Sequence, residues 1–121
     1  MTNPSDRQFE QMLQEKGLTA PRITPDLVQA NIKEVHYFTA AQGVEGGAQE
    51  DFPEYTANLK LLTFCVLVLQ NGFTVTGESA CASPENFDAE AGRIAARRNA
   101  ENKIWPLMGY ELKCRLAKGE V

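Results

Sequence analysis

The apolar run LLTFCVLVL constrains the fold of this chain more than any other segment. It predicts a strand over residues 58–70, and because successive side chains point to opposite faces of a strand, both faces of this one would be apolar. Such a strand sits centrally and is covered on both sides, by helices or by another subunit. The next two residues, Asn71 and Gly72, favour a hairpin with a two-residue turn.

A two-residue turn would fix the register of this hairpin. It would place Val68 opposite Val75 and Gly77 opposite Val66. A glycine within a strand leaves room for something to approach the sheet closely, and it also marks bulges and bends. The sequence is compatible with both interpretations of Gly77.

The main helix of the chain is predicted to follow the hairpin. The segment SPEN, starting at Ser83, combines a serine cap, a first-turn proline and an acid at the positive end of the helix. The helix would run to about Ile104 and end before Pro106. Apolar and charged residues then alternate over 110–116, which predicts a half-buried strand at the carboxyl end.

The first 32 residues predict a helical amino-terminal arm. One short helix would start after Ser5 and a second after Thr24, where a proline and an aspartate follow the threonine. Both helices are short, so each needs tertiary packing or a partner to persist. The arm is therefore a candidate for exchange with a neighbouring subunit.

These elements together predict an α+β fold, with a small antiparallel sheet packed by one main carboxyl-terminal helix and preceded by short helices. A strand over 33–42 would join the hairpin, and the glycine-rich, acidic segment 43–55 would be a solvated connection or a mobile lid. A length of 121 residues fits a single domain. The arm, residues 1–32, would precede the sheet and main helix in residues 33–121.

Charge and composition exclude several classes of protein. The net charge of −4 argues against binding to duplex nucleic acid, which normally needs a basic surface. Three cysteines without CxxC spacing favour reduced thiols over a disulfide framework. The polar start of the chain does not resemble a signal peptide, and the longest apolar run is too short to cross a bilayer. We therefore expect a cytoplasmic protein without a membrane partner.

Two polar side chains are predicted inside the apolar stripe of the main helix. At about 100° per residue, Phe87, Ile94 and Trp105 share one stripe. Arg98 falls inside this stripe, and Asn102 lies beside it. In a structural interpretation, Arg98 pairs with an acid and Asn102 bonds a strand edge. In a ligand interpretation, the guanidinium binds phosphate, the amide binds a base edge or ribose, and an aromatic ring stacks on a base.

The opposite face of the same helix carries small residues, among them Gly92, Ala96 and Ala100. Small residues allow another backbone to come close, which favours a second helix across a symmetric interface. Alternatively, these alanines are good helix formers at exposed positions. Lys103 interrupts this face, and it would reach a pocket only on a neighbouring subunit.

Catalytic and metal-binding patterns are missing from the sequence. His36 is the only histidine, Cys81 has no identifiable base beside it, and no glycine-rich phosphate loop occurs. The sequence therefore predicts no catalytic residue, no metal site, no cofactor and no enzymatic activity. The predicted ligand-binding residues are Asn86, Phe87, Arg97, Arg98, Asn102, Lys103 and Trp105.

The segment from Leu61 to Leu112 resembles a known family. Its NGF, G-x-S-x-C, PENFD and NKIWPLMGYEL motifs are similar to those of the gene-product-49/66 family of small tailed-phage proteins. TPDLVQANI and EVHYFTA resemble the preceding family segment. The resemblance implies a phage or prophage protein made in the cytoplasm of the host bacterium. The family is mostly described without an activity.

In size and element order, the chain is also similar to phage proteins that sequester nucleotide immune signals, such as Thoeris anti-defence protein one. Those proteins are oligomers that bind cyclic ADP-ribose variants, and sometimes cyclic oligonucleotides, without cleaving them. No ligand residue of that protein is matched one for one in this chain. This resemblance implies an anti-defence protein that binds a small nucleotide ligand and forms a homo-oligomer, either a dimer or an assembly of dimers.

Two other functions are compatible with the sequence. The chain is acidic, and acids in the 43–55 segment (Glu45, Glu50, Asp51 and Glu54) would mimic nucleic acid in an inhibitor that binds a host protein. An enzyme acting on a nucleotide is less favoured, because no acid–base pair can be placed in the sequence.

Overall fold

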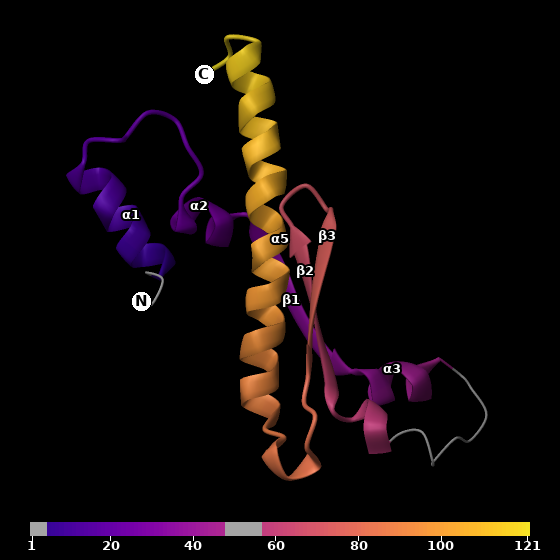
Figure 1. The fold of residues 1–121 in the computed structure, drawn as a ribbon. Coiled ribbons are helices and arrows are strands. Elements are labelled where there is room, and N and C mark those ends of the chain that lie inside the picture. The colour runs from indigo at the N-terminus through magenta and orange to yellow at the C-terminus, as the bar shows by residue number, and fades with distance from the viewer. Residues whose placement is uncertain (1–4, 48–56) are drawn as a thin grey trace. The chain divides into compact units, whose positions relative to one another are not determined.

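The fold is a small α+β arrangement of a three-stranded antiparallel sheet, short helices and one long carboxyl-terminal helix, as the sequence predicts. The computed structural model describes residues 5–47 and 57–121. They belong to two compact units, Ile32–Lys103 and Met1–Asn31 with Ile104–Val121. The elements labelled in Figure 1 are α1 (Asp6–Glu15), α2 (Pro25–Ala30), β1 (Ile32–Thr39), α3 (Ala40–Gly46), β2 (Leu62–Leu69), β3 (Thr74–Ala80) and α5 (Ala89–Ala117). A 3₁₀ helix, η1 (Pro84–Asn86), precedes α5.

Strand β2 occupies the centre of the sheet, between β1 and β3. Its side chains alternate strictly in burial, because α5 covers one face of the sheet. Cys65 and Leu67 on the covered face are inaccessible to solvent, whereas Phe64 and Val66 on the other face are half-buried. The sequence predicts that both faces of this strand are covered, and within the described residues only the face under α5 is fully covered. Cover of the second face by another subunit stays a prediction.

The β2–β3 hairpin is shifted by one residue from the predicted register. Val68 lies opposite Thr74 rather than Val75. Gly72 has a φ of 89°, and its N–H donates to the carbonyl of Leu69 at 2.9 Å. A type I turn followed by a glycine in the left-handed region makes a three-residue hairpin loop. The predicted two-residue turn is wrong, because the Asn-Gly pair fills the second and third positions of a longer loop.

The corrected register explains Gly77. It lies opposite Cys65, on the face of the sheet that α5 covers. A Cβ at Gly77 would lie 2.3 Å from the carbonyl oxygen of Ala96 and 2.3 Å from the nitrogen of Ala100. Both alanines are completely buried. The backbone that approaches the sheet is therefore that of α5 in the same chain, and the prediction that this small-residue face meets a second subunit is wrong.

Helix α5 begins later than predicted. Pro84–Asn86 forms a 3₁₀ helix, and Ser83 makes no side-chain capping bond. Instead, the carboxylate of Asp88 accepts the N–H of Ala91 at 2.9 Å, so Asp88 supplies the cap expected from Ser83. The sequence contains both capping candidates, and the 3₁₀ turn decides between them.

We expect Asp88→Ala to lower the free energy of unfolding by about 1 kcal/mol, because one helical N–H would lose its acceptor. Asp88→Asn should keep most of that stability, since asparagine caps helices as well as aspartate does. Urea unfolding followed by circular dichroism measures both variants. Equal stabilities of the alanine and asparagine variants would contradict the capping role.

Helix α5 also continues past its predicted end. Pro106 lies inside the helix, and residues 110–116 are helical rather than a strand. Proline removes the hydrogen bond to the carbonyl of Asn102, but both residues are exposed, so water can solvate that carbonyl. Leu112 is buried while Tyr110 is 75% exposed. Residues 110 and 112 would share one face of a strand, so their opposite exposures fit the helix rather than the alternating pattern.

Strand β1 ends earlier than predicted, because a helix starts in its place. Thr39 accepts the N–H of Gln42 at 3.2 Å, and the Gln42 side chain accepts the N–H of Thr39 at 2.9 Å. This capping box starts α3 inside the segment predicted as the end of a strand and the start of a loop. Residues 48–56 of the predicted loop lie outside the described residues.

The amino-terminal arm has the two short helices that the sequence predicts. Ser5 and Thr24 cap them through the N–H groups of Gln8 and Leu27. No residue of α1 is buried, although Val28 of α2 is. Exchange of the arm between subunits stays a prediction.

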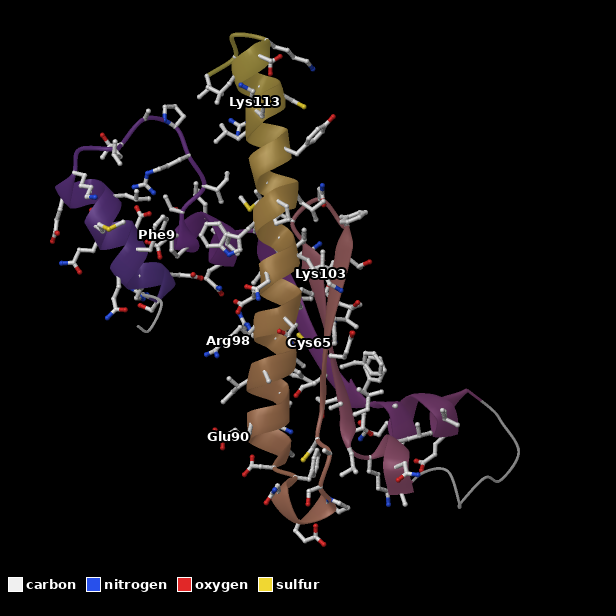
Figure 2. The ribbon with its side chains drawn as sticks, in the orientation of Figure 1. Phe9, Cys65, Glu90, Arg98, Lys103 and Lys113 are labelled. Atoms are coloured by element: carbon white, nitrogen blue, oxygen red, sulfur yellow. The ribbon has the colours of Figure 1, made fainter. Side chains whose placement is uncertain are left out.

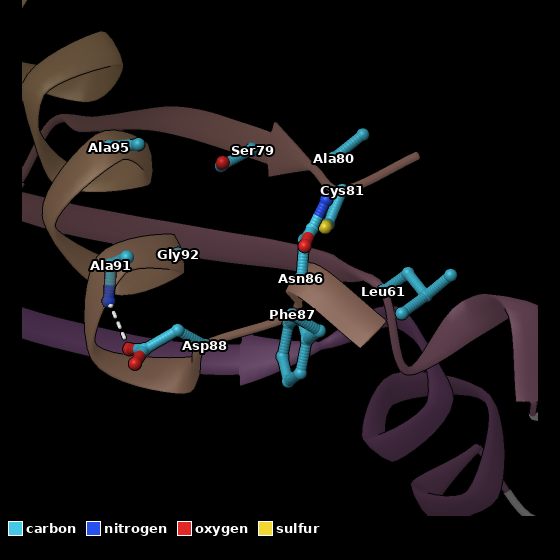
Figure 3. A pocket seen from close by; sticks show the side chains of 10 residues that line it. All are labelled: Leu61, Ser79, Ala80, Cys81, Asn86, Phe87, Asp88, Ala91, Gly92 and Ala95. Carbon is cyan, nitrogen blue, oxygen red and sulfur yellow. Dashed lines mark hydrogen bonds between the residues drawn. The ribbon is translucent and has the colours of Figure 1, made fainter. Parts of the chain in front are cut away.

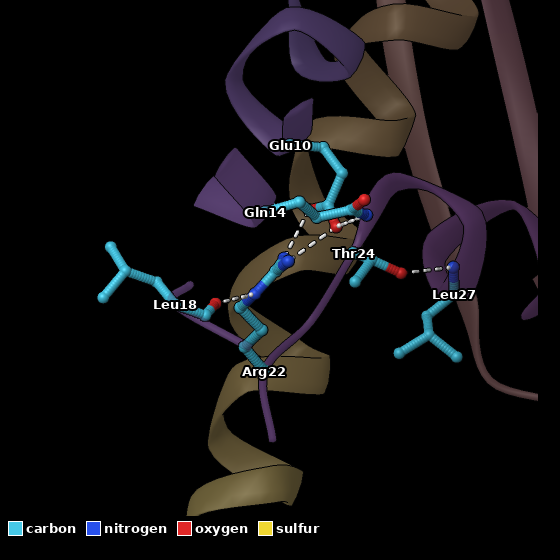
Figure 4. Close-up of polar contacts among 6 residues, drawn as sticks. All are labelled: Glu10, Gln14, Leu18, Arg22, Thr24 and Leu27. Carbon is cyan, nitrogen blue, oxygen red and sulfur yellow. Dashed lines mark hydrogen bonds and ion pairs between the residues drawn. The ribbon is translucent and has the colours of Figure 1, made fainter. Parts of the chain in front are cut away.

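An ion pair fastens α1 to the segment that precedes α2 (Figure 4). Arg22 donates from both terminal nitrogens to the carboxylate of Glu10, with one distance of 2.6 Å, and its Nε donates to the carbonyl of Leu18 at 2.8 Å. Hydrogen bonds from Arg22 hold the pKa of Glu10 below its ordinary value. The arm is therefore closed by polar contacts rather than by a core of its own.

Candidate ligand-binding site

Two hollows flank the first turns of α5. The β1 hollow has a volume of about 280 Å³ and is lined by β1, α3 and α5. The β3 hollow has a volume of about 290 Å³ and lies beside the end of β3 and η1 (Figure 3). Phe87 lines both hollows. The two therefore meet at one aromatic ring.

Aromatic rings and one arginine define the β1 hollow. Tyr37 and Phe38 come from β1, and Arg93 comes from α5. The Phe38 ring stacks on Phe64, with 5.4 Å between centroids and 20° between planes. A Cβ added at Gly43 would lie 3.4 Å from the Phe38 ring. The Phe38 ring therefore lies with Phe64 on the sheet face away from α5, and Tyr37 and Phe87 supply the rings on the α5 side of the hollow.

The two arginines on this flank of α5 differ in their partners. Arg97 approaches Glu101, with 3.5 Å from its Nε to the carboxylate, and hydrogen bonds to Tyr37. Burial lowers the pKa of Arg97, but the Tyr37 hydrogen bond and the Glu101 charge outweigh burial and raise it above its ordinary value. Arg93 has no hydrogen-bond or ion-pair partner among the described residues. Its guanidinium is thus available to an anion, whereas that of Arg97 holds Tyr37 at the hollow.

The predicted apolar stripe of α5 faces solvent rather than a core. Ile94 is 55% exposed, and Arg98 and Asn102 are exposed as well. Neither the buried ion pair predicted for Arg98 nor the strand-edge bond predicted for Asn102 is formed in the described chain. The physical reason is that the small-residue face lets the helix backbone come closer to the sheet, so that face is buried instead.

The structure does not gather the seven predicted ligand residues into one place. Asn86 and Phe87 share the β3 hollow. Arg98 and Lys103 leave α5 on different sides, about 140° apart (Figure 2). Trp105 belongs to the other unit and is partly buried. Each residue stays a ligand prediction, and of the seven only Asn86 and Phe87 line one of the two hollows.

The sequence interpretation missed three residues of the β1 hollow: Tyr37, Phe38 and Arg93. One signal for Arg93 was present, because it precedes Arg97 by four residues and shares its flank of a helix. The face on which each β1 side chain lies depends on sheet pairing, which sets Tyr37 opposite Cys65 on the α5 side and Phe38 opposite Phe64 on the other side.

Groups capable of metal or redox chemistry are scattered. Within residues 5–47 and 57–121, no three histidine, cysteine or acidic side chains gather in a way that could hold a metal ion. All three cysteines are free, and burial raises the pKa of the Cys65 thiol. His36 is exposed and lies 3.0 Å from the carboxylate of Glu34. In the described part of the chain, no helix has both the length and the apolar character needed to span a membrane.

The fold and its hollows define a small α+β protein in which one long helix covers a three-stranded sheet. The chain matches the phage protein (N4 Gp49/phage Sf6 gene 66) family over residues 23–116 and belongs to that family. The resemblance read from its motifs is thereby confirmed. Comparisons with curated proteins and with solved structures found no match.

Proposed function

We propose that this phage protein binds a cyclic nucleotide immune signal, of the cyclic ADP-ribose type or a cyclic oligonucleotide, and sequesters it without cleavage. The observation that carries the proposal is the β1 hollow, where Arg93 has no described partner and aromatic rings stand beside it. We further propose that the protein acts in the cytoplasm of the infected host bacterium, where such signals are made.

The chemistry of the β1 hollow suits the two parts of a nucleotide. Arg93 offers a planar guanidinium that can form paired hydrogen bonds with a phosphate. Tyr37 and Phe87 offer ring faces on which a base can stack, an interaction that contributes about 1–3 kcal/mol per base. Gln42 keeps its amide NH₂ for a ligand, because its carbonyl oxygen is the atom that accepts the N–H of Thr39.

The size of the β1 hollow supports an oligomeric site. Its volume of about 280 Å³ is below the range of roughly 300–1,000 Å³ common for ligand pockets. A cyclic dinucleotide held there would keep much of its surface in water. We propose that a second copy of the chain covers the exposed side of the ligand, so that the homo-oligomer is the binding-competent form.

Calorimetric titration tests the proposal. Purified protein would be titrated with cyclic ADP-ribose isomers and with cyclic di- and trinucleotides, then heated, and the released ligand would be identified by chromatography. We expect submicromolar binding by at least one ligand, which is recovered intact. A modified product would replace the proposal with an enzyme, and no binding across the panel would refute it.

The alternative function, an acidic inhibitor of a host protein, depends on Glu45, Glu50, Asp51 and Glu54. The last three lie outside the described residues, and no feature of the described surface favours this alternative over the first. A pull-down from host lysate becomes the informative experiment only if the nucleotide panel fails.

A further inference from the structure

The β3 hollow has the opposite charge character to the β1 hollow. Its polar lining includes Asp88, Asn86 and Ser79, and none of its lining residues is a lysine or arginine. Its apolar walls are Leu61, Phe87 and small residues of α5 (Figure 3). A phosphate would be repelled there, whereas hydroxyl and amino groups would find acceptors.

The two hollows adjoin at Phe87, beside the first turns of α5. Gly92 lines the β3 hollow, and Thr63 lines the β1 hollow. A Cβ added at Gly92 would lie 3.0 Å from the hydroxyl of Thr63 and 4.0 Å from the ring of Phe87. The helix is therefore packed against the sheet between the two hollows at Gly92, and the hollows meet only at Phe87, which lines both.

We propose that the two hollows form one bipolar site, in which Arg93 holds a phosphate and the β3 hollow holds the nucleoside part of the same ligand. This inference rests on the proposed function and adds the orientation of the ligand. Asp88 accepts hydrogen bonds from ribose hydroxyls or an exocyclic amine, because one of its oxygens accepts the N–H of Ala91 and the other is not used by that bond. Asn86 bonds the base or ribose from the opposite side of the hollow.

A substitution that fills the β3 hollow should block binding of the nucleoside part of the ligand without affecting binding of its phosphate part. Ala91 lines that hollow and is exposed, so Ala91→Met projects a flexible side chain into it without changing the sheet. We expect Ala91→Met to weaken binding of cyclic ADP-ribose and adenosine at least about tenfold and to leave inorganic pyrophosphate binding unchanged. Ile94→Met adds methionine to the solvent face of the same helix, and it is the matched control that should bind all three as the native chain does.

A second variant covers the case in which Ala91→Met fails to fold. Asp88→Asn keeps a helix cap but removes the carboxylate charge, and we expect about tenfold weaker binding of cyclic ADP-ribose with pyrophosphate binding equal or tighter. Calorimetry with pyrophosphate, adenosine and cyclic ADP-ribose supplies the readout. If the native protein binds the cyclic nucleotide and both variants bind it unchanged, the bipolar site is wrong and the proposed function stands. If the native protein binds none of these probes and no cyclic nucleotide, the proposed function fails and the bipolar site fails with it.

Discussion

Replacing Gly77 by alanine should strongly destabilise this protein. The added methyl group would lie 2.3 Å from the carbonyl oxygen of Ala96 and from the nitrogen of Ala100, and 2.8 Å from the carbonyl carbon of Asn99. All three are backbone atoms of α5, so no side-chain rotation can relieve the overlap. The helix would have to move off the sheet, which would open the packing above Cys65 and Leu67. We expect a loss of about 3 kcal/mol or more, at the upper end of measured overpacking effects.

Gly109→Ala is the matched control, because it adds the same methyl group to a glycine with nothing within 4 Å of the new atom. Gly109 lies inside α5, where alanine is favoured over glycine, so this variant should gain up to about 1 kcal/mol. Urea unfolding curves of the two variants should therefore move in opposite directions. A Gly77→Ala protein as stable as the native chain would mean that α5 does not pack on β3 as described.

The contact between Gly77 and α5 shows what the sequence could and could not provide. The glycine and the small residues Ala96 and Ala100 were each recognised as sites of close backbone approach. Their partnership was not recognised, because it depends on which residues of β2 and β3 face each other. Asn71-Gly72 fits both two-residue and three-residue hairpin loops, and the choice moves every side chain of β3 to the other face.

The same ambiguity misplaced the core of α5. At helical periodicity, the face of α5 that carries Phe87, Ile94 and Trp105 is more hydrophobic than the opposite face, which carries small residues. Burial follows the distance of closest approach between elements, so the small residues are covered and Ile94 is 55% exposed. The pattern thus predicts the wrong face as the core and Arg98 as a buried cation, whereas Arg98 is exposed.

The sequence fails to predict the carboxyl-terminal half of α5 for a different reason. Proline before residues 110–116 is a good local signal for a helix end, and alternation after it is a good local signal for a strand. Both signals are overruled in the folded chain, where α5 is continuous through Pro106 and both Ile104 and Leu112 are buried. The predictions of α1, α2 and the apolar run of β2 are confirmed, because local capping or composition there agrees with the tertiary environment. The predicted strand begins too early, since β2 starts at Leu62 rather than at residue 58.

The second large effect concerns ligand binding. It distinguishes a site at Arg93, which lines the β1 hollow, from a site at Arg98, which the sequence predicts. We expect Arg93→Gln to weaken binding of the cyclic nucleotide by about 10- to 100-fold, the usual range for losing a charge-assisted hydrogen bond to phosphate. Arg93→Lys should fall between the native chain and Arg93→Gln, because lysine keeps the charge and loses the planar fork.

Arg98→Gln is the control for this experiment. It removes the same charge from the same helix, but Arg98 lies on the solvent face of α5 and lines neither hollow. Calorimetric affinities should therefore be unchanged within about twofold for Arg98→Gln, since a single exposed charge outside the site acts only through screened long-range attraction. Both substitutions are at exposed helical positions, where effects on stability are usually within about 0.5 kcal/mol, so the comparison reports binding rather than folding. The reverse result, in which Arg98→Gln loses affinity and Arg93→Gln keeps it, would move the ligand to the solvent face of α5.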